Sequence, residues 1–250
     1  MKSKTIAISQ PTFLPWLGWF DLADQSDLFV ILDTVSFSKQ SWQQRNRIRT
    51  QSGLEYLSVP VKTSGRFGQR IKDCEIVNQS YLVKMIKSLY INYNKAPFFD
   101  SVSSDFINTM QTAARNNRLA ELNIALIFWI AKYLGISTKM VMASTLDAGG
   151  QRGEYVASIC ACMGADRYLS PSGAEEYLLE DRRYFEQRSV EVFIQMYEHP
   201  EYVQQFKPFM PFASTLDLIF NVGPNAGAIM RSGRRVSRAL VENKQTMAGN

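Results

Sequence analysis

A basic segment at residues 37–49 holds the side chains best suited to binding a phosphate group. Three arginines recur there at every second position, with Lys39 before them, and arginine forks bind oxyanions through paired hydrogen bonds. In an extended chain the three arginines would share one face. The alternative is a solvated basic edge strand that deters pairing between sheets. Because the segment follows a predicted strand, we favour a ligand site formed by Lys39, Trp42, Arg45, Asn46 and Arg47.

A second candidate stretch, residues 10–20, follows the first predicted strand and opens the first predicted helix. Ligands of parallel sheets bind at the carboxyl ends of strands, near helix N-termini whose free N–H groups favour anions. Two prolines stiffen this stretch, and its glycine permits a close approach of the backbone. The alternative is that its aromatic residues only pack the helix on the sheet. We assign the aromatic residues mainly to packing, and expect ligand contacts from Gln10, Pro11, Trp16 and Gly18.

His199 is the only histidine in the chain, so any imidazole general base must be this residue. It follows a predicted strand, which places it at a carboxyl end. The alternative is a structural histidine, and the sequence leaves both roles open. Tyr202 and Gln204 lie in the same stretch and are candidate ligand-binding residues.

The segment 214–224 combines a helix signature with two polar residues that could act together. Ser214 has the position of an N-cap, and a Gly-Pro pair ends the helix. This capping explains most of the motif. Asp217 and Asn221 are one turn apart and share a face, so they could reach one ligand. We predict Asn221 as a ligand contact, and Asp217, together with Asp33 at the end of the second predicted strand, as a catalytic candidate beside His199.

Several common signatures are absent from the sequence. No glycine-rich dinucleotide or P-loop motif, no G-x-S-x-G and no histidine-rich metal pattern occurs. We therefore predict no metal site. Cys160 and Cys162 are two apart in a predicted helix and would not face each other, so core packing explains them better.

The composition is that of a soluble globular protein. The chain has 250 residues, 46% hydrophobic and 20% charged, with a net charge of +5, which excludes disordered, collagen-like and disulfide-scaffold classes. The longest apolar run, Ile124–Ala131, is far shorter than the roughly 20 residues that span a bilayer. No secretory signal is visible, and three cysteines are too few for a disulfide framework. We expect a reduced, cytoplasmic protein.

The positive charge is concentrated in two segments. Residues 37–72 carry eight Lys or Arg against Glu55, a net +7, and residues 223–250 carry five against Glu242, a net +4. The remaining parts are slightly acidic. One compact patch suits a phosphate-bearing small molecule better than an extended nucleic-acid track.

Hydrophobic periodicity alternates between strands and helices. It predicts strands at 5–9, 28–32, 54–61, 138–142, 167–170 and 190–196, and helices at 16–25, 84–93, 104–115, 119–134, 153–163, 181–188 and 215–222. Such βαβ alternation indicates a mostly parallel sheet with flanking helices, Rossmann-like, of the α/β class. We predict one domain over residues 1–224 with a helical insertion at about 80–134, and a basic C-terminal tail over 225–250 that is weakly ordered from Arg231 onward.

Together these stretches resemble the WbqC-like protein family. The resemblance rests on the opening block IAISQPTFLPWLGWFDLADQSDLFVILDTVSFSKQSWQQRNRI, then on YNKAPFF, YLSPSGAEEYL, HPEYVQQ and STLDLIFNVGP. It adds Tyr93, Lys95 and Ser172 as ligand-binding candidates. The chain departs from the family pattern at Ser36, where a Gln is usual, and at Met85, where a His is usual; the second departure leaves His199 without a histidine partner.

The resemblance implies an accessory enzyme of bacterial surface-polysaccharide (O-antigen) synthesis. The hypothesis is a transferase or ligase that forms an amide between a small acyl or aminoacyl group, such as glycine, and the amine of a nucleotide-linked sugar. An adenylated intermediate would require ATP with Mg²⁺. Two alternatives remain: a non-catalytic sugar-nucleotide-binding accessory protein, and an aminoacyl transferase that binds tRNA.

Overall fold

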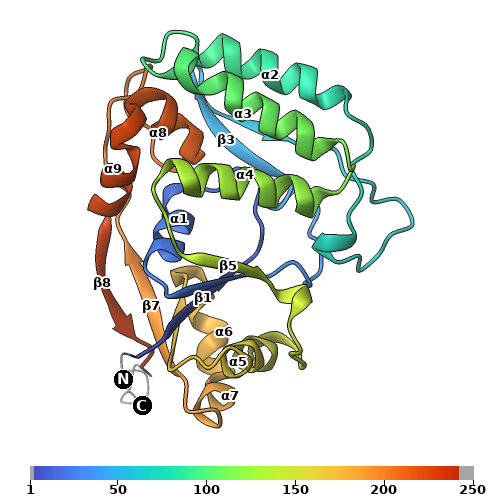
Figure 1. Ribbon diagram of the computed structural model, residues 1–250, viewed down its shortest axis with the longest axis vertical. Coiled ribbons are helices and arrows are strands. Elements are labelled where there is room, and N and C mark those ends of the chain that lie inside the picture. The colour runs from blue at the N-terminus through green and yellow to red at the C-terminus, as the bar shows by residue number, and fades with distance from the viewer. Residues whose placement is uncertain (1–2, 242–250) are drawn as a thin grey trace, which may run out of the picture.

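A six-stranded, mostly parallel sheet forms the centre of the molecule (Figure 1). A computed structural model describes residues 3–241. The strand order is β5-β2-β1-β6-β7-β8, and only β8 runs antiparallel to its neighbour. A separate antiparallel hairpin pairs β3 with β4. The strands are β1 (Thr5–Ser9), β2 (Leu28–Ile31), β3 (Arg45–Thr50), β4 (Gly53–Ser58), β5 (Lys139–Met142), β6 (Arg167–Ser170), β7 (Glu191–Tyr197) and β8 (Arg234–Ala239).

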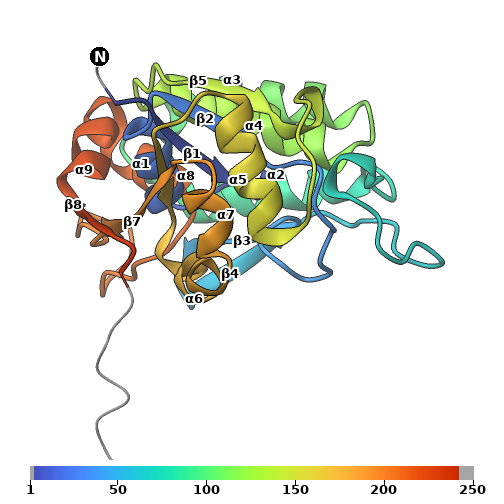
Figure 2. The same cartoon turned by 90° about the horizontal axis from the view of Figure 1, so that it is seen from below.

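Helices cover both faces of the sheet (Figures 1 and 2). The α-helices are α1 (Leu17–Asp24), α2 (Ser80–Tyr93), α3 (Phe99–Ala114), α4 (Leu119–Tyr133), α5 (Arg152–Cys162), α6 (Glu175–Glu180), α7 (Arg182–Glu186), α8 (Thr215–Val222) and α9 (Ala226–Ser232). Short 3-10 turns are η1 (Ile71–Asp73), η2 (Ala143–Thr145), η3 (Ser172–Ala174) and η4 (Gly223–Asn225). One core lies between the sheet and α1–α4, α8 and α9; the other lies between the sheet and α5–α7.

Burial on both faces explains why the central strands are continuous apolar runs. In β1, Ile6 and Ile8 pack toward α5–α7, while Ala7 packs toward α1. The predicted α/β class, with a parallel sheet, flanking helices and a helical insertion, is confirmed. The insertion consists of α2, α3 and α4, which follow the β3–β4 hairpin and precede β5.

The C-terminal segment differs from the predicted weakly ordered tail. Within the described chain, residues 226–239 form α9 and β8, and β8 pairs with β7. The rest of the predicted tail, 242–250, lies outside the described residues. The segment is ordered because its arginines neutralise carboxylates elsewhere: Arg231 and Arg234 bind Asp24, Arg234 also binds Asp21, Arg235 binds Glu198 and Arg238 binds Glu175.

The ion pairs at Asp24 respond to pH in a defined direction. Burial alone would raise the pKa of this carboxyl, but hydrogen bonds and charge from Arg231 and Arg234 outweigh burial and lower the pKa below its ordinary 3.8. A lowered pKa means that the folded state holds the carboxylate form more strongly than the unfolded state does. The stabilisation is therefore present above the ordinary pKa and is lost as the pH falls through the lowered value.

The sheet reverses its winding direction between β1 and β6. From β1 the chain proceeds to β2 and then β5 on one side, whereas β6, β7 and β8 extend on the other. In open α/β sheets, ligands bind outside the carboxyl ends of the strands at such a switch point. The topology therefore directs attention to the ends of β1 and β6, near Ser9 and Ser170.

Replacing Arg234 by Ala should destabilise the fold. Asp21 has no exposed surface and would lose the guanidinium that binds it. Breaking such a buried pair lowers the free energy of unfolding by about 3 kcal/mol, which urea unfolding would measure. The matched control is Arg235→Ala on the same strand, whose partner Glu198 is exposed, with a loss below about 1 kcal/mol. Equal losses for both variants would contradict this account.

Candidate functional site

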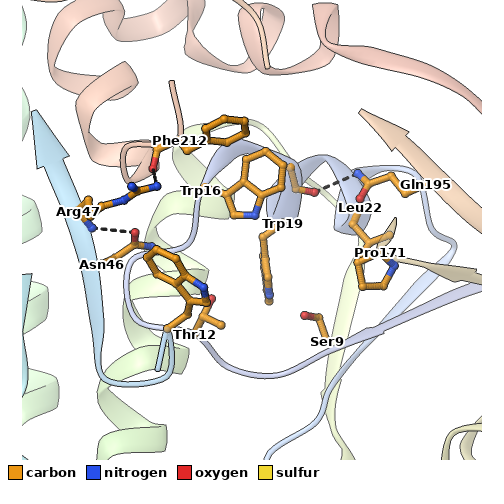
Figure 3. Close-up of a pocket in the computed structure, with 12 residues that line it drawn as sticks. Ser9, Thr12, Trp16, Trp19, Leu22, Asn46, Arg47, Pro171, Gln195 and Phe212 are labelled. Atoms are coloured by element: carbon orange, nitrogen blue, oxygen red, sulfur yellow. Dashed lines mark hydrogen bonds between the residues drawn. The ribbon is translucent and has the colours of Figure 1, made fainter. Parts of the chain in front are cut away.

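A pocket of about 320 Å³ lies at the switch point (Figure 3). The strand ends contribute Ser9 from β1, Pro171 after β6 and Gln195 from β7. Four aromatic side chains form much of the wall: Trp16, Trp19, Trp42 and Phe212. The remaining lining residues are Thr12, Gly18, Leu22, Asn46 and Arg47. Aromatic walls with a few polar groups suit a ligand that contains rings.

Two buried asparagines hold the loop that enters the pocket. Asn46 donates through Nδ2 to the carbonyl oxygens of Phe13 (3.2 Å) and Leu14 (2.7 Å). Asn123 of α4 donates to Pro11 O and to Gln43 O, both at 2.8 Å. The first predicted stretch and the basic segment are therefore adjacent, as we expected from their places at neighbouring strand ends.

Gln10 and Pro11 hold this loop in place and do not line the pocket. The side chain of Gln10 accepts a hydrogen bond from Gln43 Nε2 at 2.7 Å, and its carbonyl accepts one from Trp19 Nε1 at 3.2 Å. Pro11 is buried and its carbonyl is bound by Asn123. Both residues therefore set the shape of the loop beside the pocket.

The close contact between Trp16 and Gly18 sets the shape of one wall. Trp16 immediately precedes α1, and its indole lies against the first turn of that helix. A Cβ atom on Gly18 would stand 2.3 Å from Trp16 Cη2, far inside van der Waals contact. Only glycine at this position leaves room for the indole, and both predicted residues line the pocket.

Arg47 brings positive charge to the pocket wall. Its guanidinium lies 5.4 Å from the centre of the Trp42 ring, and Nη2 donates to Phe212 O at 3.5 Å. Its Nε is buried and has no hydrogen-bond partner within the described chain. Because Arg47 lines the pocket, its guanidinium can bind an anionic group of a ligand. Arg45 does not line the pocket; it lies over the Tyr56 ring, 4.4 Å from its centre.

Most of the other basic residues between 37 and 72 are neutralised or buried. Lys62 and Arg66 both bind Glu75, and Arg70 binds Asp73. Arg49 is buried, and its guanidinium donates to the carbonyls of Thr50 and Pro208. The net +7 of this segment therefore does not form one free patch, because the acidic partners lie just beyond residue 72.

His199 lies behind Trp16 and does not line the pocket. Its ring stacks on that of Trp16 with centroids 6.3 Å apart, and it also contacts Tyr202, Phe209 and Phe212. Nδ1 donates to Pro200 O at 2.9 Å, and Nε2 is buried without a partner among the described residues. Burial lowers the pKa of the imidazole below 6.5, although the hydrogen bond to Pro200 opposes the shift. His199 is neutral at neutral pH, and its catalytic role stays a prediction.

Asp217 is the centre of a closed hydrogen-bond network. The carboxylate has no exposed surface and accepts from Tyr93 Oη, Tyr202 Oη and Gln204 Nε2, each at 2.8 Å, and from Asn221 Nδ2 at 3.5 Å. Five predicted site residues are thus brought together, but in the interior, away from the pocket wall. Burial raises the pKa of Asp217 above 3.8 against the lowering effect of these hydrogen bonds. Burial likewise raises the pKa of both tyrosines well above 10.

The remaining predicted residues lie apart from the pocket. Asp33 is buried at the end of β2 and accepts from Ser144 N at 2.9 Å and Ser144 Oγ at 2.6 Å, so it ties β2 to the turn after β5. Lys39 and Lys95 are exposed, and Ser172 is exposed beside Pro171. In the ranges that the structure describes, no cluster of His, Cys, Asp or Glu could hold a metal ion.

Several pocket residues were missed by sequence reasoning. Ser9 ends β1 and Pro171 follows β6, the positions that the topology singles out, and Thr12 lies in the loop after β1. Gln195 is a polar residue inside an apolar strand, a signal that could have identified it. Phe212 carried no signal, because its place depends on the loop before α8 folding over β3.

Replacing Asp217 by Asn should lower the free energy of unfolding by about 2 kcal/mol, because the Asn amide has one acceptor oxygen in place of two and leaves buried donors unpaired. The raised pKa of Asp217 means that this carboxyl holds its proton more tightly in the folded state than in the unfolded state. The contribution of the protonated carboxyl to the free energy of unfolding is therefore full below pH 3.8 and is lost as the pH rises through the raised pKa. The difference in stability between wild type and variant, measured by denaturant unfolding, should therefore shrink as the pH rises. Asp147→Asn, at an exposed position, is the control. If the difference in stability between wild type and Asp217→Asn grows as the pH rises, the raised pKa of Asp217 is refuted.

No helix in residues 3–241 is long and apolar enough to cross a membrane. A search of solved structures found no match. The chain is 34% identical over 233 residues to an uncharacterized protein of Mycobacterium tuberculosis, Rv1507c, and the match covers 93% of this chain and the whole of that protein. The family model described as the WbqC-like protein family matches residues 10–229. The chain therefore belongs to the WbqC-like protein family.

Proposed function

We propose that the protein binds a nucleotide-linked sugar in the pocket at the switch point. The observation that carries this proposal is that three tryptophans and Arg47 line the same pocket, which lies at the carboxyl ends of β1 and β6. Indole faces stack on bases and sugar rings. The guanidinium supplies donors for a phosphate oxygen.

The pattern of ion pairs favours a small ligand over a nucleic acid. A protein that follows a nucleic-acid backbone uses many accessible cations. Here Lys62, Arg66 and Arg70 are paired with acids, and so are the four arginines of α9 and β8. The charge that remains at the pocket suits one or two phosphates, so binding of tRNA is the less favoured alternative.

We further propose, on the family resemblance, that the bound sugar carries an amine which the protein acylates in the cytoplasm during surface-polysaccharide synthesis. In this step the amine nitrogen forms a C–N bond with the acyl carbon, the bond from that carbon to its activating group breaks, and a base takes the amine proton. Neutral His199 has a free Nε2 lone pair for this role. Trp16 stands between it and the pocket, so the proposal requires that the indole move when substrate binds.

A non-catalytic role is the second candidate. The pocket wall includes no carboxylate, histidine, lysine or cysteine of the described residues. In its present shape the pocket can hold a ligand, but none of its lining residues can remove a proton from that ligand. This observation favours an accessory protein that presents a sugar nucleotide to a partner enzyme.

Binding is tested by substituting the pocket wall. Trp42→Ala and Arg47→Ala should each weaken binding of UDP- and dTDP-linked sugars at least about tenfold, because one loses a stacking face and the other a charged donor. Isothermal titration calorimetry would measure the dissociation constants. Arg70→Ala is the control, since this basic residue of the same segment is paired with Asp73 and should leave affinity unchanged. Binding that is insensitive to both wall variants would refute the site.

Amide formation is tested with purified protein, ATP, Mg²⁺, glycine and a nucleotide-linked amino sugar. The expected result is a glycyl amide detected by mass spectrometry, at least about a hundredfold reduced in His199→Gln through loss of general base catalysis. Normal binding of the sugar nucleotide without any amide, with glycine or with other small acyl donors, would favour the accessory role. Product that forms at the wild-type rate in His199→Gln would remove His199 from the reaction.

A further inference from the structure

We propose that Gln195 presents a fixed hydrogen-bond acceptor to the pocket and thereby selects ligands that carry an N–H or O–H group at that end. This inference rests on the proposed sugar-nucleotide function and specifies the chemistry of the sugar. Gln195 lies in β7, is 5% exposed and lines the pocket (Figure 3). It acts as a specificity-determining residue.

The hydrogen bonds of the side-chain amide define which atom is which. Its Nε2 lies 3.0 Å from Gly18 O and 2.8 Å from Asp21 Oδ2. A peptide carbonyl and a carboxylate are both acceptors, so the atom between them must be the nitrogen. Both amide hydrogens are used in these two bonds. The only capacity left for a ligand is that of Oε1, which accepts from no other residue in the described part of the chain.

Asp21 prevents the amide from turning over. The carboxylate has no exposed surface, and it is bound by Arg234 Nε at 2.8 Å and by Gln25 Nε2 at 2.5 Å. A flipped amide would place Oε1 against Asp21 Oδ2 and against Gly18 O, which puts acceptors together without a hydrogen between them. The orientation of the Gln195 amide is therefore fixed by the hydrogen bonds around Asp21, whose other donors, Arg234 and Gln25, do not line the pocket.

The pairing of β7 with β8 is irregular opposite this position. Between Ile194 and Met196, two residue steps along β7 face three steps along β8, from Arg238 to Arg235. Irregularities of this kind re-aim side chains and are frequent next to binding sites. The extra residue here lies on β8, opposite Gln195, in the strand that begins with Arg234, the partner of Asp21.

The pocket consequently has two unlike ends. Figure 3 shows Arg47 and Asn46 on one side, Gln195 and Pro171 on the other, and Trp16 and Trp19 between them. Arg47 is a donor and suits a phosphate, whereas Gln195 Oε1 is an acceptor. The ligand that fits is a ring with an anionic group at one end and an amine or hydroxyl at the other, and a ketone or ether at that second position would leave Oε1 unpaired.

The test compares a UDP- or dTDP-linked amino sugar with its counterpart that has a ketone at the same carbon. Calorimetry should show that the wild type binds the amino sugar at least about tenfold more tightly, because a buried site built for a donor rejects an analogue lacking it. Gln195→Met should reduce this ratio to about one and leave affinity for the free nucleoside diphosphate unchanged. Gln79→Met is the control, since it makes the same change at a residue that neither lines the pocket nor binds Asp21, and it should preserve the ratio.

The possible failures are distinguishable. If nucleoside diphosphates bind and depend on Arg47, but the ratio persists in Gln195→Met, the inference about Gln195 is wrong and the proposed function stands. If no nucleotide probe binds the wild type, the proposed function fails and takes the inference with it. If Gln195→Met does not fold, as circular dichroism would show, the wild-type ratio decides: equal affinities or a preference for the ketone overturn the proposal.

Discussion

Asp21 places a carboxylate in the interior of the molecule, with no exposed surface, between α1 and the strands β7 and β8. A charge in that position is tolerated only when hydrogen-bond donors surround it. The donors come from three elements that are far apart in the sequence: Gln25 after α1, Gln195 in β7 and Arg234 in β8. The position of α1, the incorporation of β8 into the sheet and the orientation of a pocket residue therefore depend on one interaction.

The proline-rich loop before α1 poses a related problem of unpaired backbone groups. Prolines have no N–H to offer, and the loop's carbonyl oxygens point into regions from which water is excluded. Side chains supply most of the missing donors: Asn123 for Pro11 O, Asn46 for Phe13 O and Leu14 O, and Thr215 Oγ1 for Pro15 O at 2.8 Å. The backbone N–H of Thr215 also donates to Pro15 O, at 3.0 Å. The loop's shape is thus set by α4, β3 and α8. The helical insertion contributes to the pocket in this way without lining it.

Elements with strong local patterns were predictable from the sequence. The runs at Thr5–Ser9 and Arg167–Ser170, and the capped helix Thr215–Val222, have the predicted bounds, because two-sided burial and capping act over a few residues. The strand β8 was not predictable in this way, since the arginine-rich sequence RRVSRA is typical of a solvated basic segment. Only distant carboxylates, Asp21 and Asp24 among them, make a strand of it.

The candidate site also contains residues that local patterns predict correctly and residues whose surroundings depend on distant contacts. Trp16, Gly18, Trp42, Asn46 and Arg47 were predicted from their places near strand ends and do line the pocket. Tyr93, Tyr202, Gln204, Asp217 and Asn221 were also predicted, and they do converge, but on one another. Polar residues on an apolar face indicate convergence of some kind. Whether a ligand or another part of the chain satisfies them depends on tertiary contacts that no local pattern contains.

Charge counted along the chain has the same weakness as an indicator of function. The net charge of a sequence window sums the charges of residues that are neighbours in the chain. The electric field at a site instead depends on the charges that are neighbours in space. Three of the eight cations in residues 37–72 are paired with Glu75 or Asp73, and the four arginines of α9 and β8 are paired with four acids from other elements. Arg47 differs from these cations because it lines the pocket and has no acidic partner among the described residues. The position of a single cation at a cavity wall, more than the net charge of a segment, therefore indicates where an anion would bind in this fold.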